Sequence, residues 1–137
     1  MEIEEFFSTY QSAAWNKDAT AMINLYDKQA VIFDMWDQGF LLDPSAWAAV
    51  ITDWFDSLNN EKVKVEFEMI NIQQSGNTGF ANALIKFQAI SKEGNVLRSM
   101  KNRITLGFLK AEDDWKVIHQ HTSAPISSNN LTAVLDI

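Results

Sequence analysis

The apolar residues of this chain change their spacing near Lys62, and this change limits the folds available to it. Before Lys62, apolar residues recur every three or four positions, as on one face of an α-helix. From Lys62 onward, segments such as KVKVEFEM alternate apolar and charged residues, as in a β-strand with one buried face. A helical half followed by a run of strands predicts an α+β domain.

Three segments before Lys62 have the pattern of amphipathic helices. The first lies within residues 3–14, and the second is a short helix that begins after Asp18, a favourable N-cap. The third begins at Asp43-Pro44, an N-cap followed by a proline at the first helical position. Its apolar residues are Trp47, Val50, Ile51, Trp54, Phe55 and Leu58. Residues 30–36, AVIFDMW, predict a strand between the second and third helices.

After Lys62 the pattern predicts four consecutive antiparallel strands, at residues 62–69, 80–91, 96–110 and 115–123. In the first of them, alternation places Val63, Val65, Phe67 and Met69 on the buried face. We expect one domain over residues 1–137, with a core over 1–125 and a loosely structured tail over 126–137. In residues 80–91, one face carries an apolar row made of Ala81, Ala83, Ile85, Phe87 and Ala89. The opposite face is partly apolar too, and the helices can cover only one face. The other face is therefore expected to be covered in part by a second copy of the chain.

Composition excludes several classes of function. The net charge of −7 and the lack of a basic run argue against nucleic acid and against anionic membrane surfaces. Without cysteine there is no disulfide, thiolate metal site or cysteine nucleophile. The start of the chain, MEIEEFF, is acidic where a secretory signal is basic, and no apolar run is long enough to span a membrane. We therefore expect a cytoplasmic protein.

Both histidines lie in the segment WKVIHQHTS, residues 115–123. Strict alternation along a strand would place Trp115, His119 and His121 on one face and Gln120 on the other. The histidines could bind zinc, act as acid and base in a pocket, or form hydrogen bonds at a dimer seam. A catalytic zinc site would need a third protein ligand, here a carboxylate, because there is no further histidine or cysteine. We favour the dimer seam, with Trp115, His119 and His121 on the outer face of the sheet, and predict no metal site.

The chain resembles the SnoaL-like branch of the nuclear-transport-factor-2-like superfamily. The resemblance is carried by LYDKQAVIFDMW, AWAAVITDWFDSL, RSMKNRIT and WKVIHQHTSAP, and it extends to about Pro125. It implies a cone-shaped barrel in which a strongly bent antiparallel sheet packs against three N-terminal helices around one deep pocket. It also implies a homodimer through the outer face of the sheet. The superfamily includes isomerases, cyclases, dehydratases and non-enzymatic binding or assembly domains, so the fold alone does not predict an activity.

The segment YQSAAWNKDATAMINLYDKQAVIFD resembles the start of ketosteroid isomerases without insertion or deletion. The resemblance implies that Tyr10 donates a hydrogen bond to an oxyanion and that Asp34 shuttles a proton. Met35 stands where those enzymes have proline, and residues 105–107 offer no second carboxylic acid, which argues against steroid isomerisation itself. Alternatively, Asp34 is the ion-pair partner of a cation such as Arg103, and Tyr10 is a core residue.

Two hypotheses about function follow. In the first, the chain is an isomerase, cyclase or hydratase that transfers a proton in an apolar pocket without a cofactor, and its ligand is a small apolar or amphipathic molecule. In the second, it is a non-catalytic ligand-binding or dimeric assembly domain. Arg103 would either neutralise Asp34 or recognise an anionic group of the ligand. The candidate catalytic residues are Asp34 and Tyr10, and the candidate ligand-binding residues are Trp36, Trp54, Phe33, Asn82, Arg103 and Gln120.

Overall fold

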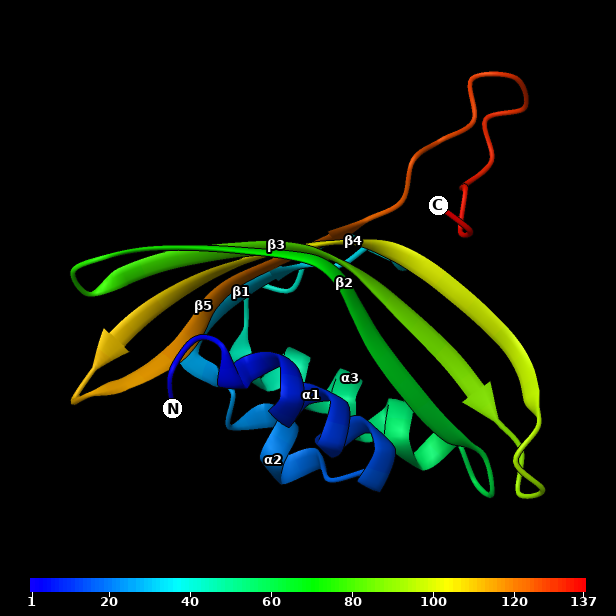
Figure 1. Cartoon of the computed structure of the whole chain (residues 1–137), viewed down its shortest axis with the longest axis horizontal. Helices are drawn as coiled ribbons and strands as arrows, with labels where there is room; N and C mark the ends of the chain where they lie inside the picture. Colours follow the sequence, from blue (N-terminus) through cyan, green and yellow to red (C-terminus); the bar gives the residue numbers. More distant parts are fainter.

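The computed structural model describes residues 1–137, apart from the side chain of Pro44. Its elements, in chain order, are α1 (Glu5–Asn16), α2 (Ala19–Ile23), β1 (Tyr26–Phe33), α3 (Pro44–Ser57), β2 (Lys62–Ser75), β3 (Thr78–Ile90), β4 (Val96–Ala111) and β5 (Asp114–Ser123). The strands form a strongly curved sheet, and the three helices lie in its concave side (Figure 1). The predicted α+β class with three helices is confirmed. No helix in the described part of the chain is long and apolar enough to cross a membrane.

The sheet has the strand order β1-β5-β4-β3-β2. The strands from β2 to β5 form the predicted antiparallel meander, in which each strand pairs with the next. The edge strand β1 pairs with β5 in parallel, and α3 and the strands from β2 to β4 lie between these two strands in the chain. The sheet is therefore a curled, unclosed cone whose edges are β1 and β2.

Aromatic side chains of α1 attach the helical layer to the sheet. Phe6 is fully buried, and its ring centroid lies 5.7 Å from that of Tyr10 and 5.7 Å from that of Phe108 in β4. In α3, the Asp43 side chain accepts a hydrogen bond from the Ser45 N–H and caps the helix, as its sequence predicts. The predicted inner row of β3, which includes Ala81, Ala83, Ile85 and Ala89, is buried beneath these helices.

A β-bulge in β5 reverses the predicted alternation of this strand. Gly107 pairs with His119 and Phe108 pairs with Val117, so that Ile118 has no partner in β4. The extra residue places Trp115 and Val117 on the inner face and the two histidines on the outer face. Trp115 is fully buried in the core. The prediction that Trp115 shares the outer face with His119 and His121 is therefore wrong.

A second bulge bends β2. Glu68 pairs with Leu84 and Asn71 pairs with Asn82, so Met69 and Ile70 stand opposite a single residue of β3. Met69 adopts a left-handed φ of 56° and is 80% exposed, which contradicts its predicted place on the buried face with Phe67. A bulge increases the local twist and bend of a strand. The two ends of β2 can therefore follow the curvature of the cone.

The tail leaves β5 on the side of the sheet opposite the helices (Figure 1). Its two halves approach each other through a bridge between Ile126 and Ala133 and a hydrogen bond from the Val134 N–H to the Pro125 carbonyl oxygen, 2.8 Å long. The Lys101 N–H of β4 donates to the Leu135 carbonyl oxygen at 2.7 Å. The segment predicted as a loosely structured tail is therefore anchored to the sheet at its far end.

Replacement of Phe6 by alanine should lower the free energy of unfolding by about 3–5 kcal/mol, because it leaves a cavity where α1 meets the sheet. Urea denaturation followed by circular dichroism measures this change. Phe40→Ala is the matched control, since Phe40 is 52% exposed in the loop before α3. The control should change the free energy by about 0.5 kcal/mol or less. Equal losses in the two variants would contradict the assigned core.

Candidate functional site

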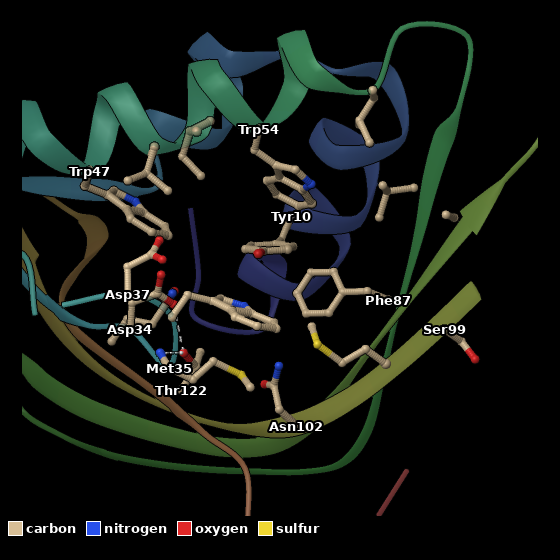
Figure 2. A pocket seen from close by; sticks show the side chains of 18 of the residues that line it. Tyr10, Asp34, Met35, Asp37, Trp47, Trp54, Phe87, Ser99, Asn102 and Thr122 are labelled. Atoms are coloured by element: carbon tan, nitrogen blue, oxygen red, sulfur yellow. Dashed lines mark hydrogen bonds between the residues drawn. The ribbon is translucent and has the colours of Figure 1, made fainter. Parts of the chain in front are cut away.

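A cavity of about 560 Å³ lies between α3 and the concave face of the sheet (Figure 2). Trp47 and Trp54 of α3 line one side, and Phe87 of β3 and Asn102 of β4 lie across from them. Most of the lining is aromatic or aliphatic, with a few polar side chains among it. This combination is typical of a site for a small organic molecule, because apolar walls supply affinity and sparse polar groups fix orientation.

Asp34 follows the last residue of β1 and is half-buried in the wall of this cavity. The Thr122 hydroxyl of β5 donates to Asp34 Oδ1 at 3.1 Å, and the Met35 N–H donates to Thr122 Oγ1 at 3.1 Å. Burial raises the pKa of the Asp34 carboxyl above its ordinary value, an effect that the hydrogen bonds from Thr122 and the Met35 backbone oppose and the nearby Asp37 reinforces. Thr122 holds one carboxylate oxygen, which leaves Oδ2 available to a ligand.

Two buried tyrosines belong to this site, one in the cavity wall and one bonded to a side chain of the wall. Tyr10 of α1 lines it and is 4% exposed, and burial together with the Asp34 charge raises the pKa of its hydroxyl. The hydroxyl therefore stays protonated at neutral pH and can act as a hydrogen-bond donor. Tyr26 of β1 donates its hydroxyl to Oε1 of Gln120, which is 2% exposed and also lines the cavity. Burial raises the pKa of both tyrosine hydroxyls and thus keeps them neutral.

Two buried polar atoms in the cavity wall lack a hydrogen-bond partner. They are Oδ1 of Asn102, whose side chain is almost fully buried, and Nε1 of Trp47. Figure 2 shows the Asn102 amide directed from β4 into the pocket. A buried polar atom without a partner costs about 1–3 kcal/mol, so a ligand that hydrogen-bonds with it would recover this free energy. The arrangement is that of a site with unused polar contacts.

Three polar side chains of the cavity, namely Asp37, Asn102 and Thr122, are not among the residues predicted for the site. A signal existed for Asn102 alone, because it interrupts the inward row of β4 between Met100 and Ile104. Asp37 lies in the turn after β1, and its place in the cavity depends on a left-handed φ of 56°. Of the predicted ligand-binding residues, Trp36, Trp54 and Gln120 do line the cavity.

The other three predicted ligand-binding residues, Phe33, Asn82 and Arg103, lie on the outer face of the sheet. Strand register explains this, because Asn102 faces inward and its neighbour Arg103 must face outward. Arg103 is exposed and donates through Nε to Ser123 Oγ at 3.1 Å. The predictions that these residues line the pocket, and that Arg103 pairs with Asp34, are therefore wrong.

The two histidines lie on the outer face with Phe33. The Phe33 ring centroid lies 4.9 Å from that of His119 and 5.5 Å from that of His121, both nearly perpendicular. His119 Nδ1 lies 2.8 Å from the Val31 carbonyl oxygen, which accepts a hydrogen bond from the ring N–H. The hypothesis of acid–base chemistry in the pocket by these histidines is therefore wrong. The described residues contain no group of three histidine, cysteine, aspartate or glutamate side chains that could hold a metal ion.

Comparison with known proteins agrees with this fold. Residues 3–127 match the family model of the SnoaL-like domain. The chain belongs to the SnoaL-like family. Its fold is also that of solved structures described as NTF2-like. No curated protein matches the chain.

Three solved structures illustrate the likeness. An NTF2-like protein of unknown function from Pseudomonas putida has a TM-score of 0.85 at 21% identity, over 98% of this chain and 92% of that one. A nuclear transport factor 2 (NTF2-like) superfamily protein from Salmonella enterica has a TM-score of 0.72 at 18% identity, over 92% and 90%. Aln2 from a Streptomyces species has a TM-score of 0.77 at 12% identity, over 89% and 87%. At these identities the likeness shows the fold.

Replacement of Thr122 by valine should raise the pKa of Asp34 further. Valine keeps the shape of the side chain but removes the hydroxyl that stabilises the ionised carboxylate. Carbon-detected NMR titration of the aspartate carboxyl groups measures the change. Thr105→Val, on the outer face of β4, is the control and should leave the Asp34 titration in place. An unchanged or lower pKa in Thr122→Val would contradict the assigned hydrogen bond.

Proposed function

We propose that the cavity binds a small apolar or amphipathic molecule and that Asp34 transfers a proton within it, without a cofactor. The observation that carries this proposal is the position of Asp34. It is a half-buried carboxylate with a raised pKa, held through one oxygen by Thr122 and adjacent to an aromatic-lined cavity. A base of this kind is best suited to proton transfer when its pKa approaches the working pH.

In the case of an isomerisation, the reaction would pass through an enolate. Asp34 Oδ2 removes a proton from carbon next to a carbonyl group, and the electron pair of that bond moves onto the carbonyl oxygen. Tyr10, whose raised pKa keeps its hydroxyl protonated, donates a hydrogen bond to that oxygen. The protonated Asp34 then returns the proton to another carbon of the same molecule. Each step uses only groups that line the cavity.

The probe 5-nitrobenzisoxazole tests proton transfer without knowledge of the natural ligand. A base that removes its carbon-bound proton breaks the N–O bond and releases a coloured cyanophenolate. We expect the protein to accelerate this reaction, and the rate to rise with pH through the raised pKa of Asp34, since only the carboxylate accepts a proton.

Asp34→Asn should abolish the acceleration, by about 100-fold or more, and should leave the circular dichroism spectrum unchanged. Asp56→Asn is the control, because Asp56 is exposed on the far side of α3 and the substitution changes the net charge equally. If Asp34→Asn retains the activity of the wild type, the proposed proton transfer is wrong and the cavity is a binding site only.

The second candidate function is assembly of two copies through the outer face of the sheet. Phe33, Phe80 and Leu109 expose 39%, 49% and 38% of their surface, and the half-buried Leu84 adds to this face. One row across the strands, in register, consists of Asn82, Thr105, His121 and Phe33, two polar side chains followed by two rings. We propose that this face joins a homodimer, with His119 and His121 at the seam.

Multi-angle light scattering at micromolar concentration should give twice the mass of one chain. Phe33→Glu should shift the protein towards the monomer, because it would bury a carboxylate without a partner at the seam. Phe40→Glu, a substitution at an exposed loop position, should leave the mass unchanged. A wild-type monomer under these conditions would contradict the proposed dimer.

A further inference from the structure

Two carboxylates, which accept hydrogen bonds without donating them when ionised, face one end of the cavity. Asp34 and Asp37 both line it, and Figure 2 shows their carboxylates side by side at the end nearest Trp47. The two groups are close enough for the Asp37 charge to raise the pKa of Asp34. Oδ1 of the nearly fully buried Asn102 is a further acceptor without a partner. These acceptor groups would be satisfied by a ligand that donates hydrogen bonds to them.

Positive charge from the protein does not balance this end of the cavity. Among the described lining residues, Arg98 is the one lysine or arginine. Its Nη2 lies 2.7 Å and 3.3 Å from the two carboxylate oxygens of Glu61, so its charge is already paired. Figure 2 shows Ser99, the next residue of β4, on the opposite side of the cavity from Asp34. The Asp34 end therefore carries uncompensated negative charge.

The walls around this charge are aromatic. Trp36, Trp47, Trp54 and Tyr10 line the cavity, and the faces of such rings attract cations through their quadrupole. Asp34 is half-buried, so water screens its charge less and its attraction for a bound cation is stronger than that of the exposed Asp37. Aromatic faces and a carboxylate pair together favour an organic cation over a neutral molecule or an anion.

We propose that the ligand is an apolar molecule that carries a protonated amine, with the ammonium group bound between Asp34 and Asp37 and a second polar group at Asn102. This inference names the ligand class for the site of the proposed function and rests on that site. An ammonium group supplies three donors, which suits neighbouring carboxylate oxygens that accept without donating. Its charge also favours the ionised form of Asp34, so binding of the amine would lower the pKa of this carboxyl.

Three probes that share one hydrocarbon group and differ in charge separate the effect of charge on affinity from the effect of apolar contact. They are 1-adamantylmethylamine, 1-adamantylmethanol and 1-adamantanecarboxylate, which are a cation, a neutral molecule and an anion at neutral pH. Their affinities can be followed by tryptophan fluorescence, since Trp36, Trp47 and Trp54 line the cavity. We expect the amine to bind at least about tenfold more tightly than the alcohol and the carboxylate to bind most weakly.

The affinity of the amine should rise with pH through the raised pKa of Asp34, while that of the alcohol stays nearly constant. The affinity rises, and does not fall, because the amine is already protonated in this pH range and ionisation of Asp34 supplies the negative partner of the ion pair. The other titratable groups around the cavity are Asp37, the Arg98–Glu61 pair, and the hydroxyls of Tyr10 and Tyr26. The tyrosines remain neutral in this pH range because burial raises their pKa values.

Asp37→Asn should weaken binding of the amine by about tenfold and leave binding of the alcohol unchanged. Asparagine suits the left-handed φ of this position, so the turn should keep its shape. Asp56→Asn removes the same charge from the exposed face of α3 and should leave both affinities unchanged. An effect confined to Asp37→Asn and to the amine would support the inference.

Equal affinity for the amine and the alcohol, no binding of the amine, or equal effects of Asp37→Asn and Asp56→Asn would each overturn the inference. Its failure is distinct from failure of the proposed function, because the neutral benzisoxazole probe needs Asp34 alone and no cation site. Conversely, if the amine binds as expected but the benzisoxazole reaction does not occur, the ligand class stands and the proton transfer is wrong.

Discussion

Two β-bulges decide which side chains of this sheet face the helices. If β5 continued the alternation of Trp115 and Val117 without a bulge at Ile118, both histidines would face inward and Gln120 and Thr122 outward. The bulge at Met69 and Ile70 acts similarly in β2, where Ile72 regains the inner face and packs against the core. The cavity depends on these irregularities, since Thr122 can reach Asp34 only from the inner face. A regular sheet of the same sequence would have no such site.

Asp34 is tolerated in this environment through a balance of opposing effects. Removal from water raises the pKa of its carboxyl, while hydrogen bonds from Thr122 and the Met35 backbone lower it. The pKa of the Asp34 carboxyl is higher in the folded chain than in the unfolded chain. The stabilising contribution of the protonated carboxyl is therefore fully present at a pH below the unfolded-state pKa. It is lost as the pH rises through the folded pKa. At neutral pH the ionised carboxylate therefore opposes folding, which is typical of a residue whose role is chemical.

Local signals in the sequence were sufficient for the helices and for most of the strands. Asp43 caps α3 as its side chain and the following proline predict, and the alanine row of β3 is buried as its alternation predicts. The errors arise where side-chain direction depends on another strand. Trp115 and Met69 were assigned to the wrong face because a bulge can be seen only when two strands are paired. Arg103 and Asn102 differ by one position, so a choice between them required the register of β4.

The contact between the tail and β4 also protects an edge of the sheet. β5 ends opposite Arg103, and beyond this point the backbone groups of β4 lack that neighbour. The tail takes its place at Lys101, through the hydrogen bond to Leu135 and the parallel bridge to Asp136. An uncovered strand edge is a template on which other chains can pair and aggregate. Release of these last few residues would therefore expose unpaired backbone groups of β4 between Met100 and Asn102, two residues that line the cavity. Another chain could pair with these groups.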